Sequence, residues 1–210
     1  MATKVVQDVS VTEAFMVLKD QLEAFKLHVF IKLKQTSHFD ELKTNVSNKK
    51  VLLQVDFSEN VSLMSQNEIQ SAHWANSQAT VFTAHLWAGN NVSRGYVIVS
   101  DFLQHNKLSV HAFMRKLFQE LKILCPGIEE IDVYSDGAAS QFKQRYLFQN
   151  LNFWQSEFKL KLRWHYFATS HGKGVVDGHG GTIKRLVWRQ VKSGACHATI
   201  AREFFTVAEA

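Results

Sequence analysis

The sequence predicts an α/β domain: a mixed five-stranded sheet flanked by helices, with one further helix in front of it. Three observations support this class. Short apolar runs alternate with helical patterns along the chain. The 210 residues, 46% of them hydrophobic, suffice for one substantial core. The chain has a single proline and no Ser/Gly-rich stretch, which argues against a flexible linker between two domains.

The N-terminal segment predicts a long helix. Ser10 and Glu13 match a capping box, in which each side chain satisfies a backbone N–H at the helix start. Apolar side chains then recur at steps of three and four residues: Phe15, Leu18, Leu22, Phe25 and Val29. This stripe needs a partner surface, and packing on the same domain is favoured over a second subunit. Residues 36–50 are polar and predict a connector, so the chain divides into an N-terminal helix and connector, 1–50, and a main domain, 51–210.

Strand and helix patterns alternate through the main domain. Apolar or alternating runs predict five strands: 51–55, 79–87, 96–99, 131–135 and 160–166. Helical spacing predicts three helices: 110–124, about 140–158, and a last helix around 183–191 that follows a glycine-rich turn. Three strands, then helix, strand, helix, strand and helix is the order of the ribonuclease H-like fold. In that fold an antiparallel meander is extended by parallel strands through helical crossovers.

Three aspartates fall at the ends of predicted elements. Asp56 follows the first strand, Asp136 follows the fourth, and Asp177 lies at the start of the last helix. Ligand sites of α/β sheets gather where strands end, and the first and fourth strands are neighbours in this fold. We therefore expect the three carboxylates to meet at one edge of the sheet.

Carboxylates at such a place suit phosphodiester chemistry. Two Mg²⁺ ions about 3.5–4 Å apart stabilise the attacking and the leaving oxygen of an in-line displacement. Mg²⁺ prefers hard oxygen ligands and keeps several waters, so three carboxylates and the substrate phosphate suffice, with Mn²⁺ as a substitute. Asp56 is expected to bridge both ions, while Asp136 and Asp177 each take one, in either assignment. The alternative is that each aspartate caps a turn or a helix, and this applies to Asp177 above all.

Four segments also resemble a known family. Val55–Asn60, Glu68–Trp74, Tyr134–Lys143 and Ser170–Gly178 are similar to the catalytic region of eukaryotic transposon-encoded DDE/D transposases. These belong to the ribonuclease H-like superfamily, together with retroviral integrases. The resemblance implies metal-dependent cleavage and transfer of DNA strands, with Asp56, Asp136 and Asp177 as the triad. Many members carry Glu at the third position. The shorter Asp requires a closer helix, which Gly178, Gly180 and Gly181 would permit.

Basic residues near these motifs are candidates for DNA contacts: Lys143, His171, Lys173, Lys184 and Arg185. For each the alternative is an exposed helix start, a surface loop or a solvated basic face. The formal net charge of +5 agrees with a polyanionic partner. The sequence shows no signal peptide, no membrane span and no disulfide framework, so we expect an intracellular, nuclear protein.

The function expected is that of a DNA transposase catalytic core. A ribonuclease H-like nuclease and a domesticated domain that binds DNA or protein without cutting remain as alternatives. No helix-turn-helix or zinc finger precedes Val51, so the sequence reader is expected in a further domain or a partner. A homo-oligomer is a family-level expectation.

Overall fold

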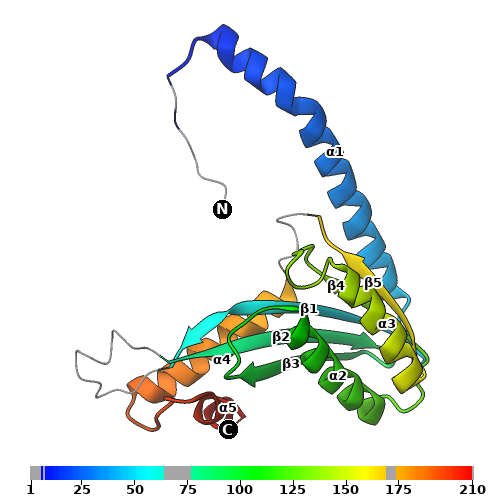
Figure 1. The fold of residues 1–210 in the computed structure, drawn as a ribbon, viewed down its shortest axis with the longest axis vertical. Helices are drawn as coiled ribbons and strands as arrows, with labels where there is room; N and C mark the ends of the chain where they lie inside the picture. The colour runs from blue at the N-terminus through cyan, green and yellow to red at the C-terminus, as the bar shows by residue number, and fades with distance from the viewer. Residues whose placement is uncertain (1–5, 7, 64–76, 169–173, 210) are drawn as a thin grey trace.

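The computed structural model describes residue 6 and residues 8–63, 77–168 and 174–209 (Figure 1). The strands are β1 (Lys50–Ser62), β2 (Gln78–Ala88), β3 (Val92–Ser100), β4 (Glu130–Ser135) and β5 (Lys161–Tyr166). The helices are α1 (Val11–Thr44), α2 (Lys107–Leu124), α3 (Arg145–Phe158), α4 (Val175–Lys192) and α5 (Ala201–Glu209).

The sheet has the order β3-β2-β1-β4-β5. β1, β2 and β3 form an antiparallel meander, and β4 and β5 join it in parallel with β1. Asn90 and Asn91 turn the β2–β3 hairpin with φ angles of 57° and 58°, a backbone region that Asn tolerates well. This topology confirms the predicted ribonuclease H-like fold.

Helices cover both faces of the sheet (Figure 1). On one face α2 and α3 pack over the main core, which contains the alternate β1 residues Val51, Leu53 and Val55. On the other face α4 and α5 pack over the far ends of β1 and β2, and the base of α1 packs over Leu52 and Tyr134. The second face also carries Gln54 and Asp56, because side chains alternate along a strand. Its central strip therefore holds polar groups between two apolar clusters.

The structure corrects several element boundaries. The connector predicted from residue 36 is wrong in its first part, because α1 continues to Thr44. Phe39 and Leu42 pack on the sheet there, and this tertiary contact holds a polar segment in a helix. β1 extends to Ser62 because its polar half is paired with β2. α3 begins at Arg145 rather than near residue 140, and α5 was not predicted.

Helix α1 begins as predicted, since both hydrogen bonds of the Ser10–Glu13 capping box are present. The expectation that its apolar stripe packs on the same domain is wrong. The N-terminal two-thirds of α1 projects away from the sheet, and Phe15, Leu18 and Phe25 are exposed (Figure 1). In the part of the chain that the structure describes, no helix is long and apolar enough to cross a membrane.

Candidate active site

Asp56 and Asp136 lie side by side because of the register between β1 and β4. The parallel ladder pairs Lys50 with Glu130 and ends at Gln54 and Tyr134. Asp56 in β1 and Asp136 just after β4 each come two residues beyond that last pair, and Asp56 is on the sheet face that Gln54 also occupies. The sequence predicted Asp56 at the end of the first strand, but it lies inside β1. It lies where β4 has stopped and one side of β1 is open.

Helix α4 brings Asp177 to the same place. A β-carbon on Gly174 would lie 2.9 Å from Gln54 Nε2, and one on Gly180 would lie 2.7 Å from Ser58 Oγ. Gly174 and Gly180 therefore touch β1 on either side of Asp56, and Asp177 is midway between them in the helix. The close approach expected from the glycines is made by Gly180. Gly178 and Gly181 have open space where a β-carbon would be.

The three acids interact electrostatically. Burial, and after it the negative charge of Asp136, raise the pKa of Asp56 to about 7. A hydrogen bond from the Phe57 N–H opposes the rise, and the charge of Asp177 adds to it. A half-buried carboxylate crowded by two others holds its proton near neutral pH. This is the electrostatic state that a bound divalent cation relieves, and such perturbed groups cluster at functional sites.

Each acid also has a local backbone role, as the capping alternative predicts. Asp56 Oδ1 accepts from Phe57 N at 2.8 Å, and Asp136 Oδ1 accepts from Ala138 N at 3.2 Å. Asp177 Oδ2 accepts from Gly174 N at 2.8 Å and so caps the start of α4. These bonds orient the side chains, and both interpretations agree with them.

The acids fit magnesium in kind, because all three are hard oxygen donors. Among residues 8–63, 77–168 and 174–209, however, no three His, Cys, Asp or Glu side chains are close enough together to hold an ion. Coordination would therefore need side-chain movements, of Asp177 in particular, since its Oδ2 accepts a hydrogen bond from Gly174 N.

A histidine pair joins α4 to the sheet beside the acids. His85 Nδ1 lies 2.7 Å from His179 Nε2, and His85 Nε2 lies 2.9 Å from Ser93 Oγ. Burial lowers the pKa of His85 to about 4, with help from the charges of His179 and Lys43, so His85 is neutral at physiological pH. Gly95 makes room for the His179 ring, which would lie 2.7 Å from a β-carbon there. The pair holds α4 down on β2 and β3.

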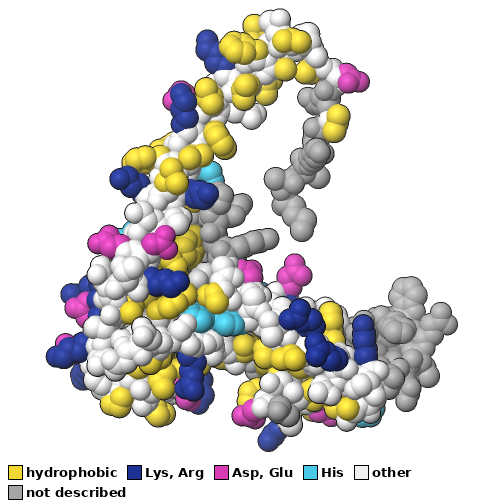
Figure 2. Space-filling view, turned by 180° about the vertical axis from the view of Figure 1, so that it is seen from behind, with side chains coloured by type: hydrophobic (Ala, Val, Ile, Leu, Met, Phe, Trp, Pro, Cys, Tyr) yellow, Lys and Arg dark blue, Asp and Glu magenta, His cyan; other side chains and the backbone are white. Residues whose placement is uncertain are grey.

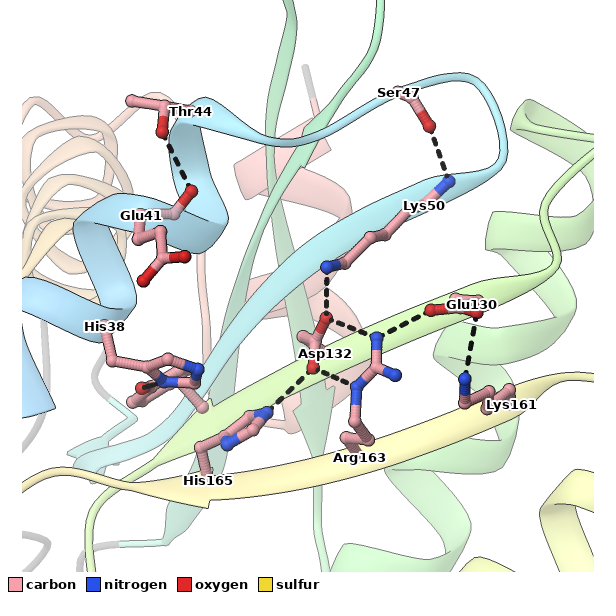
Figure 3. Close-up of polar contacts among 11 residues, drawn as sticks. His38, Glu41, Thr44, Ser47, Lys50, Glu130, Asp132, Lys161, Arg163 and His165 are labelled. Atoms are coloured by element: carbon pink, nitrogen blue, oxygen red, sulfur yellow. Dashed lines mark hydrogen bonds and ion pairs between the residues drawn. The ribbon is translucent and has the colours of Figure 1, made fainter.

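A second polar cluster lies under the base of α1 (Figure 3). Asp132 is 1% exposed and accepts from Arg163 at 2.7 and 3.0 Å, while His165 Nε2 lies 2.8 Å from its Oδ1. Lys50 Nζ is 3.6 Å away, and Glu130 binds the same arginine. Burial alone would raise the pKa of Asp132, but the hydrogen bonds and charges of His165 and Arg163 hold it well below its usual range. This cluster joins three neighbouring strands.

The predicted DNA-contacting residues are placed differently from one another. Lys143 is exposed in the turn after Asp136, with Nζ 5.7 Å from the Tyr166 ring centroid. Lys184 Nζ donates to the Glu59 carbonyl at 2.5 Å, and burial lowers its pKa. Arg185 is exposed on α4. His171 and Lys173 lie outside the described residues.

A basic hollow continues along α4 beyond the acids. Its volume is about 600 Å³, and it is lined by Gly181, Lys184, Arg185, Trp188, Arg189 and Lys192. Lysine and arginine side chains gather over this part of the molecule (Figure 2). Trp188 is 38% exposed among them. Sequence reasoning missed Trp188, since a tryptophan in an amphipathic helix is usually buried.

The sequence analysis also did not predict the roles of His85, His179 and Asp132. For Asp132 a signal exists, because an acid between Ile131 and Val133 in a central strand requires a cation on a neighbouring strand. Nothing in the sequence pairs His85 with His179, which are 94 residues apart.

Comparison with known proteins places this chain in a family. Residues 35–210 match the model of a family described as "Domain of unknown function (DUF8701)". The chain belongs to this family. The DUF8701 match contains all three acids and begins inside α1.

Other comparisons add little about the site. A solved structure of the catalytic core domain of BIV integrase is similar, with 13% sequence identity and a TM-score of 0.40 over 75% of this chain and 80% of that chain. Similarity of this degree says nothing about activity. A comparison with curated proteins gives no match.

Proposed function

We propose that this DUF8701 protein is the catalytic core of a nuclear DNA transposase, which cleaves phosphodiester bonds and transfers DNA strands with Asp56, Asp136 and Asp177. One observation carries the proposal. The β1–β4 ladder ends two residues before Asp56 and Asp136, and the charges of both Asp136 and Asp177 act on the half-buried Asp56. A turn cap or a helix cap accounts for each acid alone, but not for their convergence on one carboxylate.

The position of each aspartate suggests its role in binding metal. Asp56, between the other two, would be shared by both metal sites, and Asp136 and Asp177 would each complete one. Two Mg²⁺ ions, or Mn²⁺ in their place, would when bound offset the charge on the attacking and the leaving oxygen. The neutral His85 and its partner His179 act as positioning residues, because they fix the helix that carries Asp177.

The DNA backbone would follow the basic side of α4. Arg185, Arg189 and Lys192 line the hollow that begins about one turn beyond Asp177, and Lys143 is exposed in the turn after β4. Lys184 lines the same hollow, although its ammonium group is bound to the Glu59 carbonyl. Lys184 would therefore attract DNA through the electrostatic potential of its positive charge more than through direct contact with a phosphate.

Nicking of a labelled supercoiled plasmid tests the proposal. The wild type is compared with Asp56→Asn, Asp136→Asn and the control Asp101→Asn, an exposed acid just after β3. We expect cleavage with Mg²⁺ or Mn²⁺ in the wild type and the control, none in EDTA, and none in the two site variants. Cleavage that survives in both site variants contradicts the assignment.

A non-cutting DNA-binding domain is the second candidate. It is favoured by the Asp177 cap on Gly174 and by the spacing of the acids, which is too wide for an ion in the described structure. Calorimetric titration with Mn²⁺ separates the two. Binding that is lost in Asp56→Asn supports the catalytic site even if the isolated chain does not cut, and absence of binding supports the non-cutting domain.

A further inference from the structure

The free part of α1 exposes an apolar surface. Within α1, which the structure describes in full, Leu42 alone is buried. Towards the N-terminus the exposed fractions of Phe15, Leu18 and Phe25 are 64%, 61% and 62%. Hydrophobic side chains cover much of the part of α1 that projects from the body (Figure 2). A helix standing alone in water is marginally stable, and an apolar surface of this length marks a contact with another molecule.

The apolar residues have the spacing of a coiled coil. The stripe runs at alternating steps of four and three residues: Val11, Phe15, Leu18, Leu22, Phe25 and Val29. The next two positions in this pattern are Lys32 and Thr36, so the stripe ends there. It ends just before Phe39 and Leu42, where α1 packs on its own sheet. The match to the family also starts at Gln35, so the stripe precedes the part of the chain that the family shares.

The charges beside the stripe indicate which partner fits. Lys19 and Lys26 lie along one flank, and Ala14, Gln21 and His28 lie along the other. Glu13 and Asp20 lie on the far side of the helix, and Glu23 is paired with Lys26 at 2.8 Å. Two copies in parallel place the lysine flank of each against the lysine-free flank of the other. An antiparallel pair would place lysines against lysines.

Other partners fit less well. An anionic lipid surface attracts helices with cations along both borders of the apolar face, and here one border of the stripe has no lysine or arginine between Val11 and Val29. An acidic partner helix would find a cation on one flank only. A second copy of the same helix meets apolar against apolar in register, with no charge left facing a like charge.

We propose that the chain associates with a second copy of itself through a parallel two-stranded coiled coil of α1, with Val11 to Val29 as the seam. The pairing places both catalytic bodies at the same end of the coil. It is independent of the proposed activity, since it rests on α1 alone.

The mass of the full chain in solution tests the pairing. We expect twice the chain mass of 24.0 kDa by light scattering or sedimentation equilibrium at tens of micromolar. Leu18→Glu with Phe25→Glu should give single chains, with at least a tenfold weaker association. Val17→Glu with Leu27→Glu is the matched control, because these side chains are 56% and 60% exposed on the opposite side of α1. Unchanged thermal unfolding of the body excludes a folding defect.

The orientation is tested by cross-linking. In a Cys125→Ala, Cys196→Ala background, Val11→Cys should form a disulfide dimer on mild oxidation, because a parallel pair brings the two copies of position 11 together. An antiparallel pair would instead cross-link Val11→Cys with Val29→Cys in a mixture of the two variants.

The opposite results are equally clear. The proposal is overturned by single chains in the wild type, by a mass of three or more chains, by dissociation of the control variant, or by the antiparallel cross-link. A wild type that stays single and co-sediments with vesicles of phosphatidylserine and phosphatidylcholine would assign the stripe to a lipid surface.

Discussion

Asp56 should make the metal-free protein less stable than it would be without this charge. The pKa of Asp56 is about 7 in the fold against 3.8 for an ordinary aspartate. The folded state therefore holds the Asp56 proton more tightly than the unfolded chain does. The stability that this proton contributes is present below about pH 4 and is lost as the pH rises from about 4 to 7. At pH 8 the carboxylate is fully charged and its cost is complete.

The size of the effect follows from the same pKa difference. One tenfold step in the proton equilibrium is worth about 1.4 kcal/mol, so ionising Asp56 costs the fold up to roughly 4 kcal/mol. Salt screens part of this, because Asp177 is exposed. Asp56→Asn keeps the shape and the acceptor for the Phe57 N–H but removes the charge. We therefore expect the variant to be about 2–4 kcal/mol more stable than the wild type at pH 8.

Urea unfolding in EDTA at pH 5 and at pH 8 measures this. The gain at pH 5 should be roughly a third to a half of the gain at pH 8, where it should reach its full size. Saturating Mg²⁺ should close the gap by stabilising the wild type alone. Asp101→Asn is the control and should change little at either pH. Equal stability of wild type and Asp56→Asn at pH 8 would refute the reasoning, because burial and the neighbouring acids would then not raise the pKa of Asp56.

Three further outcomes are expected. Gly180→Ala should lower the free energy of unfolding by about 1–3 kcal/mol and reduce cleavage, because the new β-carbon has no room against β1. Its control, Gly181→Ala, should be as stable as the wild type or up to about 1 kcal/mol more stable, measured by urea unfolding. Asp132→Asn should cost about 2–4 kcal/mol in the same measurement, against less than about 1 for the exposed Glu129→Gln. Trp188→Ala should weaken binding of single-stranded DNA by about 5- to 150-fold, the worth of one stacked base, and leave duplex binding nearly unchanged by fluorescence anisotropy; equal losses on both substrates would exclude stacking.

The sequence predicts the sheet of this protein well because its strands are short apolar runs between clear turns. The boundaries fail where tertiary contacts override local composition. Residues 36–44 are polar, yet they stay helical because Phe39 and Leu42 find Leu52 and Tyr134 on the sheet. β1 continues past Asp56 because β2 pairs with its polar half, and a partner strand cannot be seen in the composition of the first.

The candidate site is predictable to a similar depth. Asp56 and Asp136 could be paired from the sequence, because the strand order puts their strands together. The sequence could not predict how deeply Asp56 is buried or that Asp177 caps α4, since both depend on how α4 lies on the sheet. The glycines that decide this, Gly174 and Gly180, do so through contacts with Gln54 and Ser58 that no local pattern encodes.

The cluster at Asp132 bears directly on how the acids are aligned. It lies on β4 four residues before Asp136, and its cations come from the neighbouring strands, Lys50 from β1 and Arg163 from β5. An ion cluster shared by three adjacent strands fixes their register, because a slip of one residue would turn Asp132 into the apolar core between the sheet and α2. The same slip would turn Asp136 away from Asp56. The ion cluster around Asp132 therefore keeps Asp56 and Asp136 aligned, although these two acids repel each other. Loss of Asp132 should disturb the candidate site even though Asp132 does not contact it.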